Sequence, residues 1–135
     1  MKPISILILF VLATSVPRAP AADAMKPSMP GVSEERAFPQ TQGSDLYQAA
    51  CQACHMPEGL GATAAASYPA LAKDPRLKPK AYAIVRVLKG SKAMPPFKDV
   101  LSDEQIVAVV GYVRTHFGNH YSDKISLDDV KALRQ

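Results

Sequence analysis

The stretch CQACH at residues 51–55 most constrains how this chain can fold, because it places two cysteines and a histidine within five positions. Cys51 and Cys54 are three residues apart, so on a helix both thiols project from one face, one turn apart. His55 follows Cys51 by four residues and lies on the same side. The pattern therefore predicts a helical turn that presents three ligand side chains to a single site.

The spacing of these three residues is that of c-type haem attachment, C-x-x-C-H. Two thiols on one helical turn can form thioethers with the two vinyl groups on one edge of the porphyrin, and the histidine then faces the iron. Attachment consumes both thiols, and the chain has only two cysteines. The motif predicts one covalently bound haem c, attached through Cys51 and Cys54, with His55 as a ligand of its iron.

Three other interpretations of the motif remain open. A structural zinc site needs four protein ligands, and His116 and His120 complete a formal CxxC…HxxxH set. Sixty-one residues separate Cys54 from His116, however, which is far more than in a zinc finger. A thioredoxin-like redox pair requires a βαβ context, which the sequence does not indicate. A chance match is the third alternative.

The first 24 residues have the organisation of a secretory signal peptide. Lys2 precedes the apolar run ISILILFVLATSV, which is short for a membrane span, and the small residues APAADA follow. Cleavage is expected after Ala21 or Ala24, with an uncleaved membrane anchor as the alternative. We therefore expect a periplasmic protein without a membrane span in its mature form. That location also favours haem over a chance match, because c-type haem is attached outside the cytoplasm.

Four helices are expected, and no segment alternates as a strand does. They run from the cap at Ser44-Asp45 to about Cys54, from Pro79 to just before Gly90, from the Ser102–Gln105 capping box to Gly118, and from Ser126 to Arg134. The helices are short, and a loop of more than twenty residues separates the first two, so a buried cofactor would complete the core. We predict an all-α fold with three to four helices wrapped around one covalently bound haem c.

The chain divides into four expected parts. Residues 1–24 form the signal peptide, and residues 25–42 hold three prolines among polar residues, which is typical of an arm or linker. Residues 43–118 form the cytochrome-like domain, and residues 119–135 form a C-terminal extension with a short helix.

Met94, in the segment SKAMPPF, is expected to be the second iron ligand, since His/Met ligation is typical of electron-transfer haems. Met56 adjoins His55 and cannot reach the opposite face of the haem. The two prolines after Met94 hold its loop extended. The other methionines lie in the signal peptide or the arm: Met1, Met25 and Met29. A gap-filling core residue is the alternative role for Met94.

From about Gly43 to Phe117 the sequence resembles the class I cytochrome c family. The segments that carry the resemblance are GSDLYQAACQACH, YPAL, AMPPF and VVGYVRTHF. The resemblance implies that Gly43 and Tyr47 pack the first helix against Val109 and Tyr112 of the last helix of that domain.

The resemblance also implies roles for two loop residues. Pro69 would offer its carbonyl to the second ring nitrogen of His55 and so fix the imidazole, and Leu71 would pack on the haem. The family's usual glycine before this proline is Tyr68 here, and an ordinary loop proline is the alternative. The tail after Gly118 is similar to the tails of cytochrome subunits associated with periplasmic dehydrogenases, or it is a helix that covers an apolar patch.

Two protein ligands on the iron leave no open position for a substrate, and no acid–base or nucleophile pattern accompanies the motif. We therefore expect an electron-transfer protein rather than an enzyme: a carrier, or a subunit of a complex, that passes electrons from a dehydrogenase to an oxidase or another cytochrome. One alternative is a haem sensor or catalytic haem protein with an open sixth position. Another is an interaction module that docks through residues 25–42 and 119–135. The formal net charge of +4 suits an acidic partner and does not indicate nucleic acid.

Overall fold

The computed structural model describes residues 38–63 and 67–135. The signal peptide expected at residues 1–24 and residues 25–37 of the expected arm lie outside this part of the chain. The described residues are helical and contain two isolated bridges but no β-strand. The prediction of an all-α fold is therefore confirmed. None of the helices in these two ranges has the length and apolar character needed to cross a bilayer.

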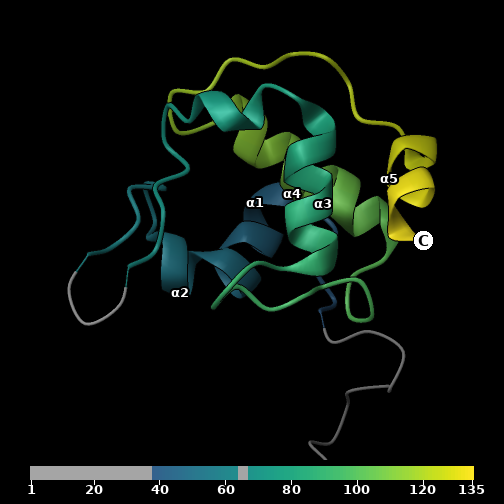
Figure 1. Ribbon diagram of the computed structural model, residues 1–135, viewed down its shortest axis with the longest axis horizontal. Helices are drawn as coiled ribbons and strands as arrows, with labels where there is room; N and C mark the ends of the chain where they lie inside the picture. Colours follow the sequence, from purple (N-terminus) through teal and green to yellow (C-terminus); the bar gives the residue numbers. More distant parts are fainter. Residues whose placement is uncertain (1–37, 64–66) are drawn as a thin grey trace, which may run out of the picture.

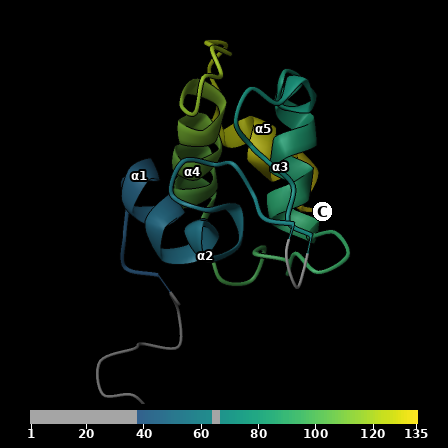
Figure 2. The ribbon, with the colours of Figure 1, turned by 90° about the vertical axis from the view of Figure 1, so that its left-hand side faces the viewer.

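The helical elements follow one another in two groups. They are α1 (Gly43–Leu46), a π-helical turn (Tyr47–Cys51), α2 (Gln52–His55), a 3₁₀ turn (Pro75–Leu77), α3 (Lys80–Lys89), α4 (Asp103–Thr115) and α5 (Leu127–Arg134). The first three are consecutive and form one helix with a wider turn in its middle. α4 contacts α1, α3 and α5, and α5 lies on the side of the domain opposite to α2 (Figure 1, Figure 2).

α4 starts where the sequence predicts but ends earlier. The side chain of Ser102 accepts from the backbone N–H of Gln105, and the Gln105 side chain accepts from the N–H of Ser102, so the capping box is confirmed. The predicted end at Gly118 is wrong, because the helix stops at Thr115. The Thr115 hydroxyl and the Nδ1 of His116 donate to carbonyls of the last turn and satisfy them without further helix.

The predicted ends of α3 and the predicted start of α5 agree with the structure to within one residue. Pro79 has an extended backbone and precedes α3 instead of opening it, whereas the predicted end before Gly90 is confirmed. A proline fits either position, because it has no N–H that a helix must satisfy. α5 begins with the predicted capping box between Ser126 and Asp129.

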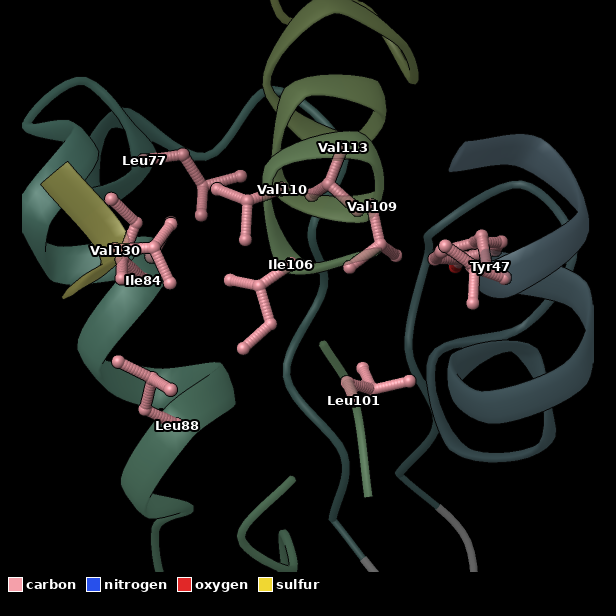
Figure 3. Close-up of a cluster of buried hydrophobic side chains, with 12 residues drawn as sticks. Tyr47, Leu77, Ile84, Leu88, Leu101, Ile106, Val109, Val110, Val113 and Val130 are labelled. Carbon is pink, nitrogen blue, oxygen red and sulfur yellow. The ribbon is translucent and has the colours of Figure 1, made fainter. Parts of the chain in front are cut away.

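Apolar residues of α4 fill the space between the other helices. Figure 3 shows Val110 and Ile106 on the side of Ile84, and Val109 on the side of Tyr47. All of these residues belong to one buried cluster. α4 is therefore the central element of the hydrophobic core.

The packing of α1 on α4 agrees with the family resemblance, with one difference. A Cβ at Gly43 would lie 2.3 Å from the carbonyl oxygen of Ala108 and 2.7 Å from Cβ of Tyr112, so only glycine permits this approach. The rings of Tyr47 and Tyr112 pack with centroids 5.8 Å apart. The difference is that the backbone of Ala108, which the resemblance did not indicate, makes the nearest approach to Gly43.

Both ends of the described chain are tied to the same core. Gln105 of α4 donates to two backbone carbonyls within residues 38–42, the last part of the expected arm. In α5, Val130 is fully buried, and Arg134 donates to Asp103 at 2.6 Å. The C-terminal helix therefore covers an apolar face of its own domain, which favours that interpretation over a free docking tail.

Candidate functional site

A cavity of about 550 Å³ is lined by residues of α2, α3, α4 and the two loops between them. The volume lies within the roughly 300–1,000 Å³ that ligand and cofactor sites occupy. Six of the lining residues are those that the sequence analysis selected: Cys51, Cys54, His55, Pro69, Leu71 and Met94. The structure thus brings the whole predicted site together, from three segments of the chain.

Two unpaired thiols lie in the wall of the cavity. Cys51 ends the π-helical turn and Cys54 lies in α2, so the helix carries both to the same side. Burial, and to a lesser extent the neighbouring Cys54, raises the pKa of Cys51 to about 12. This thiol is therefore protonated at neutral pH and behaves as a buried apolar group until it reacts.

The imidazole of His55 has a defined tautomer. Its Nδ1 lies 2.9 Å from the carbonyl oxygen of Pro69. A carbonyl can only accept, so Nδ1 donates, and in the neutral ring Nε2 then carries the lone pair. His55 is buried, which leaves the ring little freedom to reorient. The arrangement is that of a neutral imidazole prepared to bind a metal through Nε2.

The chain turns sharply after His55. Met56 has a φ of +66°, which ends α2, and the hydroxyl of Tyr47 donates to the Met56 carbonyl at 2.7 Å. Burial, and then the nearby Cys51, raises the pKa of Tyr47 to about 12, so this donor keeps its proton at neutral pH. Met56 does not belong to the cavity lining, whereas Met94 does.

The loop that carries Met94 is closed by its own backbone. Met94 and Ser91 exchange two hydrogen bonds, with N–H to oxygen distances of 2.9 and 3.0 Å. Gly90 turns the chain at the end of α3 with a φ of +69°. The N–H of Phe97 then donates to the carbonyl of Val87, which ties the loop to α3.

The loop that carries Pro69 has a different anchor. Tyr68, which occupies the position of the family's usual glycine, exchanges two backbone hydrogen bonds with Ala62. Beyond the proline, the N–H of Leu71 donates to the carbonyl of Gly59 at 2.7 Å. These bonds flank Pro69 on both sides and direct its carbonyl to His55.

Polar side chains that the sequence did not indicate also line the cavity, among them those of Asp74, Arg76, Tyr82 and Arg86. Arg76 binds Asp74 with both Nε and Nη2, and this hydrogen bond raises the pKa of Arg76. The guanidinium of Arg86 lies over the ring of Tyr82, 5.0 Å from its centroid. Tyr82 and Arg86 are four residues apart on α3, and this spacing on one helical face was the available signal.

A zinc site would need His116 beside the cysteines. The structure instead stacks the ring of His116 on Tyr112, with centroids 4.0 Å apart, at the exposed end of α4. Within the described ranges, no three His, Cys, Asp or Glu side chains form a metal-binding group. Two free thiols and a buried imidazole are the groups that attachment of haem c requires, and a methionine and apolar side chains line other parts of the same cavity.

Known proteins similar to this chain include both sequences and solved structures. Cytochrome c6 from the diatom Phaeodactylum tricornutum is 29% identical, with a TM-score of 0.45 over 67% of this chain and 92% of that chain. The cytochrome c subunit of a quinone alcohol dehydrogenase from Gluconobacter oxydans (strain 621H) is 31% identical over 105 residues. The fructose dehydrogenase cytochrome subunit from Gluconobacter japonicus is 31% identical over 109 residues.

These two dehydrogenase subunits are much longer than the chain. The matches cover 68% and 70% of this chain but only 22% of each relative. A family model described as "Cytochrome C oxidase, cbb3-type, subunit III" matches residues 39–113, which is more than half of the chain and includes every residue of the predicted site. The chain therefore belongs to this family of cytochrome c domains, and haem c is its cofactor.

Proposed function

We propose that the domain transfers single electrons through one haem c whose iron is bound by His55 and Met94. The observation that carries this proposal is the hydrogen bond from Nδ1 of His55 to the carbonyl of Pro69, at 2.9 Å. It leaves Nε2 free inside a cavity whose lining also includes Met94 and both cysteines.

Haem c supplies an iron that alternates between its ferric and ferrous states. Cys51 and Cys54 would attach the porphyrin, and His55 would bind the iron through Nε2. The thioether of Met94 is a soft ligand that favours the reduced state and raises the reduction potential. Three valines of α4 line the cavity and exclude water from it.

With His55 and Met94 both bound to it, the iron would have no open position for a substrate, so the domain would act as an electron carrier and not as an enzyme. The two dehydrogenase cytochrome subunits described above suggest where its electrons come from. We propose a dehydrogenase as the donor and a respiratory oxidase or another cytochrome as the acceptor, with the chain as a subunit or partner of the dehydrogenase.

The proposed place of action is the periplasm. It rests on the signal peptide expected at residues 1–24 and on the chemistry of c-type haem, which is attached outside the cytoplasm. In this organisation residues 25–42 are the arm, residues 43–118 hold the haem, and residues 119–135 are an extension of the domain.

Met94→Ala in the haem-loaded protein tests the ligation directly. The oxidised wild-type protein is expected to show the far-red charge-transfer band of a methionine–iron bond, and the variant is expected to lose this band. Met56→Leu is the matched control, because it changes the methionine next to His55 and should keep the band.

Two results would contradict the proposal. One is a band that survives Met94→Ala, which would show that another residue binds the iron. The other is carbon monoxide binding to the reduced wild-type protein as readily as to Met94→Ala, which would indicate an open sixth position and favour the sensor or catalytic alternative.

A further inference from the structure

The segment between α4 and α5 lies against the loop that follows Pro69. We call this segment, residues 116–125, the strap. It leaves the end of α4 and passes along one edge of the domain to α5 (Figure 1). It runs from the last residues of the expected cytochrome-like domain into the C-terminal extension, and all of it lies beyond the residues matched by the family model.

Asn119 is the most buried residue of the strap, with 2% of its surface exposed. Its Nδ2 donates to the carbonyls of Leu71 at 2.8 Å and Val113 at 2.9 Å, and its Oδ1 accepts from the N–H of Asp74 at 3.0 Å. Both amide donors are therefore used, and all three partners are backbone groups. Asn119 joins the last turn of α4 to the loop at two points.

Two further side chains connect this end of α4 to the same loop. The hydroxyl of Tyr121 donates to the carbonyl of Asp74 at 3.2 Å. Arg114, which is 1% exposed, donates to the carbonyls of Leu77 at 2.9 Å and Lys78 at 2.8 Å. Of the three connections, the one made by Asn119 to Leu71 is nearest to Pro69 along the chain.

The connection at Leu71 matters because Pro69 cannot be held by a donor of its own. Proline has no N–H that could anchor it by a hydrogen bond. The position of its carbonyl therefore depends on how the residues on either side are held. On the C-terminal side Leu71 is held from two directions, its N–H by the carbonyl of Gly59 and its carbonyl by Asn119. Two residues away, the Pro69 carbonyl must meet Nδ1 of His55.

We propose that Asn119 is a positioning residue for His55, acting through the loop that carries the Pro69 carbonyl. This inference rests on the proposed function, in which His55 binds the iron. A carbonyl held firmly at Nδ1–H makes the imidazole a stronger electron donor. Loosening the loop weakens that bond, so the reduced state of the iron becomes more favourable and the reduction potential rises.

The experiment uses the haem-loaded protein with Asn119→Ala and Asn119→Asp. The second variant has nearly the same shape and keeps an acceptor for the N–H of Asp74, but it cannot donate to Leu71. NMR measures the exchange of the His55 Nδ1–H proton with solvent, and redox titration measures the midpoint potential. Loss of a residue that bonds directly to a metal ligand typically lowers metal affinity or activity roughly 10–100-fold. Asn119 acts one step further away, so we expect a smaller effect: exchange of the His55 proton about threefold faster, and a redox equilibrium shifted about threefold toward the reduced protein.

Val130→Ala is the control for a general loss of stability. It shortens a fully buried side chain in α5, and no hydrogen bond joins that side chain to the loop. It is expected to lower the unfolding midpoint while leaving the exchange of the His55 proton and the potential unchanged.

Unchanged proton exchange and potential in both Asn119 variants would overturn the inference. Failure of the proposed ligation is a separate result, since it is measured by the methionine–iron band in the wild-type protein and in Met94→Ala and not in the Asn119 variants. If neither variant folds, native-state hydrogen exchange of the wild-type protein tests the inference instead. The amide of Asp74 and the ring N–H of His55 should open together as denaturant rises, and independent opening of the two protons would contradict the inference.

Discussion

The two loops that carry Pro69 and Met94 are held in different ways. The Met94 loop is closed by bonds between near neighbours: Ser91 pairs with Met94, and Phe97 returns to Val87. The Pro69 loop has bonds of this kind too, between Ala62 and Tyr68 and between Gly59 and Leu71, but Asn119 also binds it, across separations of 45 and 48 residues. One loop is therefore closed by its own backbone alone, and the other is also held by a distant part of the chain.

The two loops also place different groups, a methionine side chain in one and a backbone carbonyl in the other. The methionine needs a loop of defined shape that projects one side chain into the cavity, and a glycine turn followed by prolines supplies it. The histidine sits in a helix and needs a carbonyl placed at its ring, and a proline carbonyl can be placed only by its surroundings. Substitutions at the end of α4 should therefore disturb the histidine side, and substitutions at the end of α3 should disturb the methionine side.

The largest effect is expected from Arg114→Met. Removing the buried guanidinium leaves the carbonyls of Leu77 and Lys78 without their donor, at a cost of about 3 kcal/mol in the free energy of unfolding. Urea titration of the haem-loaded protein measures this loss. The methionine–iron band of the folded variant should persist, because the Met94 loop has no bond to Arg114.

Asp123→Asn is the matched control for that variant. Asp123 binds Arg114 at 2.5 Å but its side chain is 58% exposed, so solvent screens the pair and the change should cost much less than Arg114→Met. An equal loss in both variants would show that the ion pair, and not the loop carbonyls, explains the role of Arg114.

A second variant, Gly90→Ala, acts on the methionine side. Gly90 has a φ of +69°, and a Cβ there would lie 2.4 Å from the carbonyl oxygen of Met94. The strain should cost about 2 kcal/mol and displace Met94, so the methionine–iron band should weaken or disappear. Exchange of the His55 ring proton should stay at the wild-type rate if the two loops are independent.

Gly111→Ala is the matched control on α4. No neighbouring heavy atom lies within 4 Å of the Cβ it would add, so the helix should gain about 0.5–1 kcal/mol. A loss of the band in Gly111→Ala would contradict the assignment of the Gly90 effect to the Met94 loop.

The smallest effect on stability is expected from acidification, which acts on the contact between α5 and α3 and not on either of the two loops. Asp129 binds Lys80 at 2.7 Å, and this bond, followed by those to Ser126, lowers the pKa of Asp129 from 3.8 to about 2. A folded-state pKa below the unfolded value stabilises the fold above about pH 4, and this contribution is lost as the pH falls toward 2.

Thermal unfolding at several pH values between 5 and 2 measures this contribution. Asp129→Asn should unfold with a weaker pH dependence in that window, while both proteins keep the methionine–iron band at pH 5. An identical pH dependence in the two proteins would show that the Lys80–Asp129 pair does not hold α5.

Much of the fold and of the site could be predicted because local rules govern it. The one-turn spacing of Cys51 and Cys54 places both thiols on one wall, and Met94 is selected by the positions of the other methionines. The capping boxes at Ser102 and Ser126 mark the starts of α4 and α5 because a side chain there satisfies a backbone group three residues away. Such interactions join residues that are close together in the sequence, so the sequence alone indicates them.

The remaining features depend on contacts that no local pattern carries. A polar residue just after a helix is ordinary in any sequence, and nothing near Asn119 indicates that it is buried between α4 and the loop after Pro69. Arg114 gave a weak signal, as a charge beside the apolar face of α4, but its partners at Leu77 and Lys78 lie 37 and 36 residues away. Even the end of α4 at Thr115 depended on which groups satisfied its last carbonyls.

The sequence by itself determined which residues can hold a haem, because covalent spacing and helix geometry act over a few positions. Only the tertiary structure decided how the loop beyond Pro69 is held to the end of α4. That task falls to buried side chains whose hydrogen-bond partners are chosen by how α4 and the strap pack against the loop, and packing between distant segments is not encoded in any single stretch of the chain.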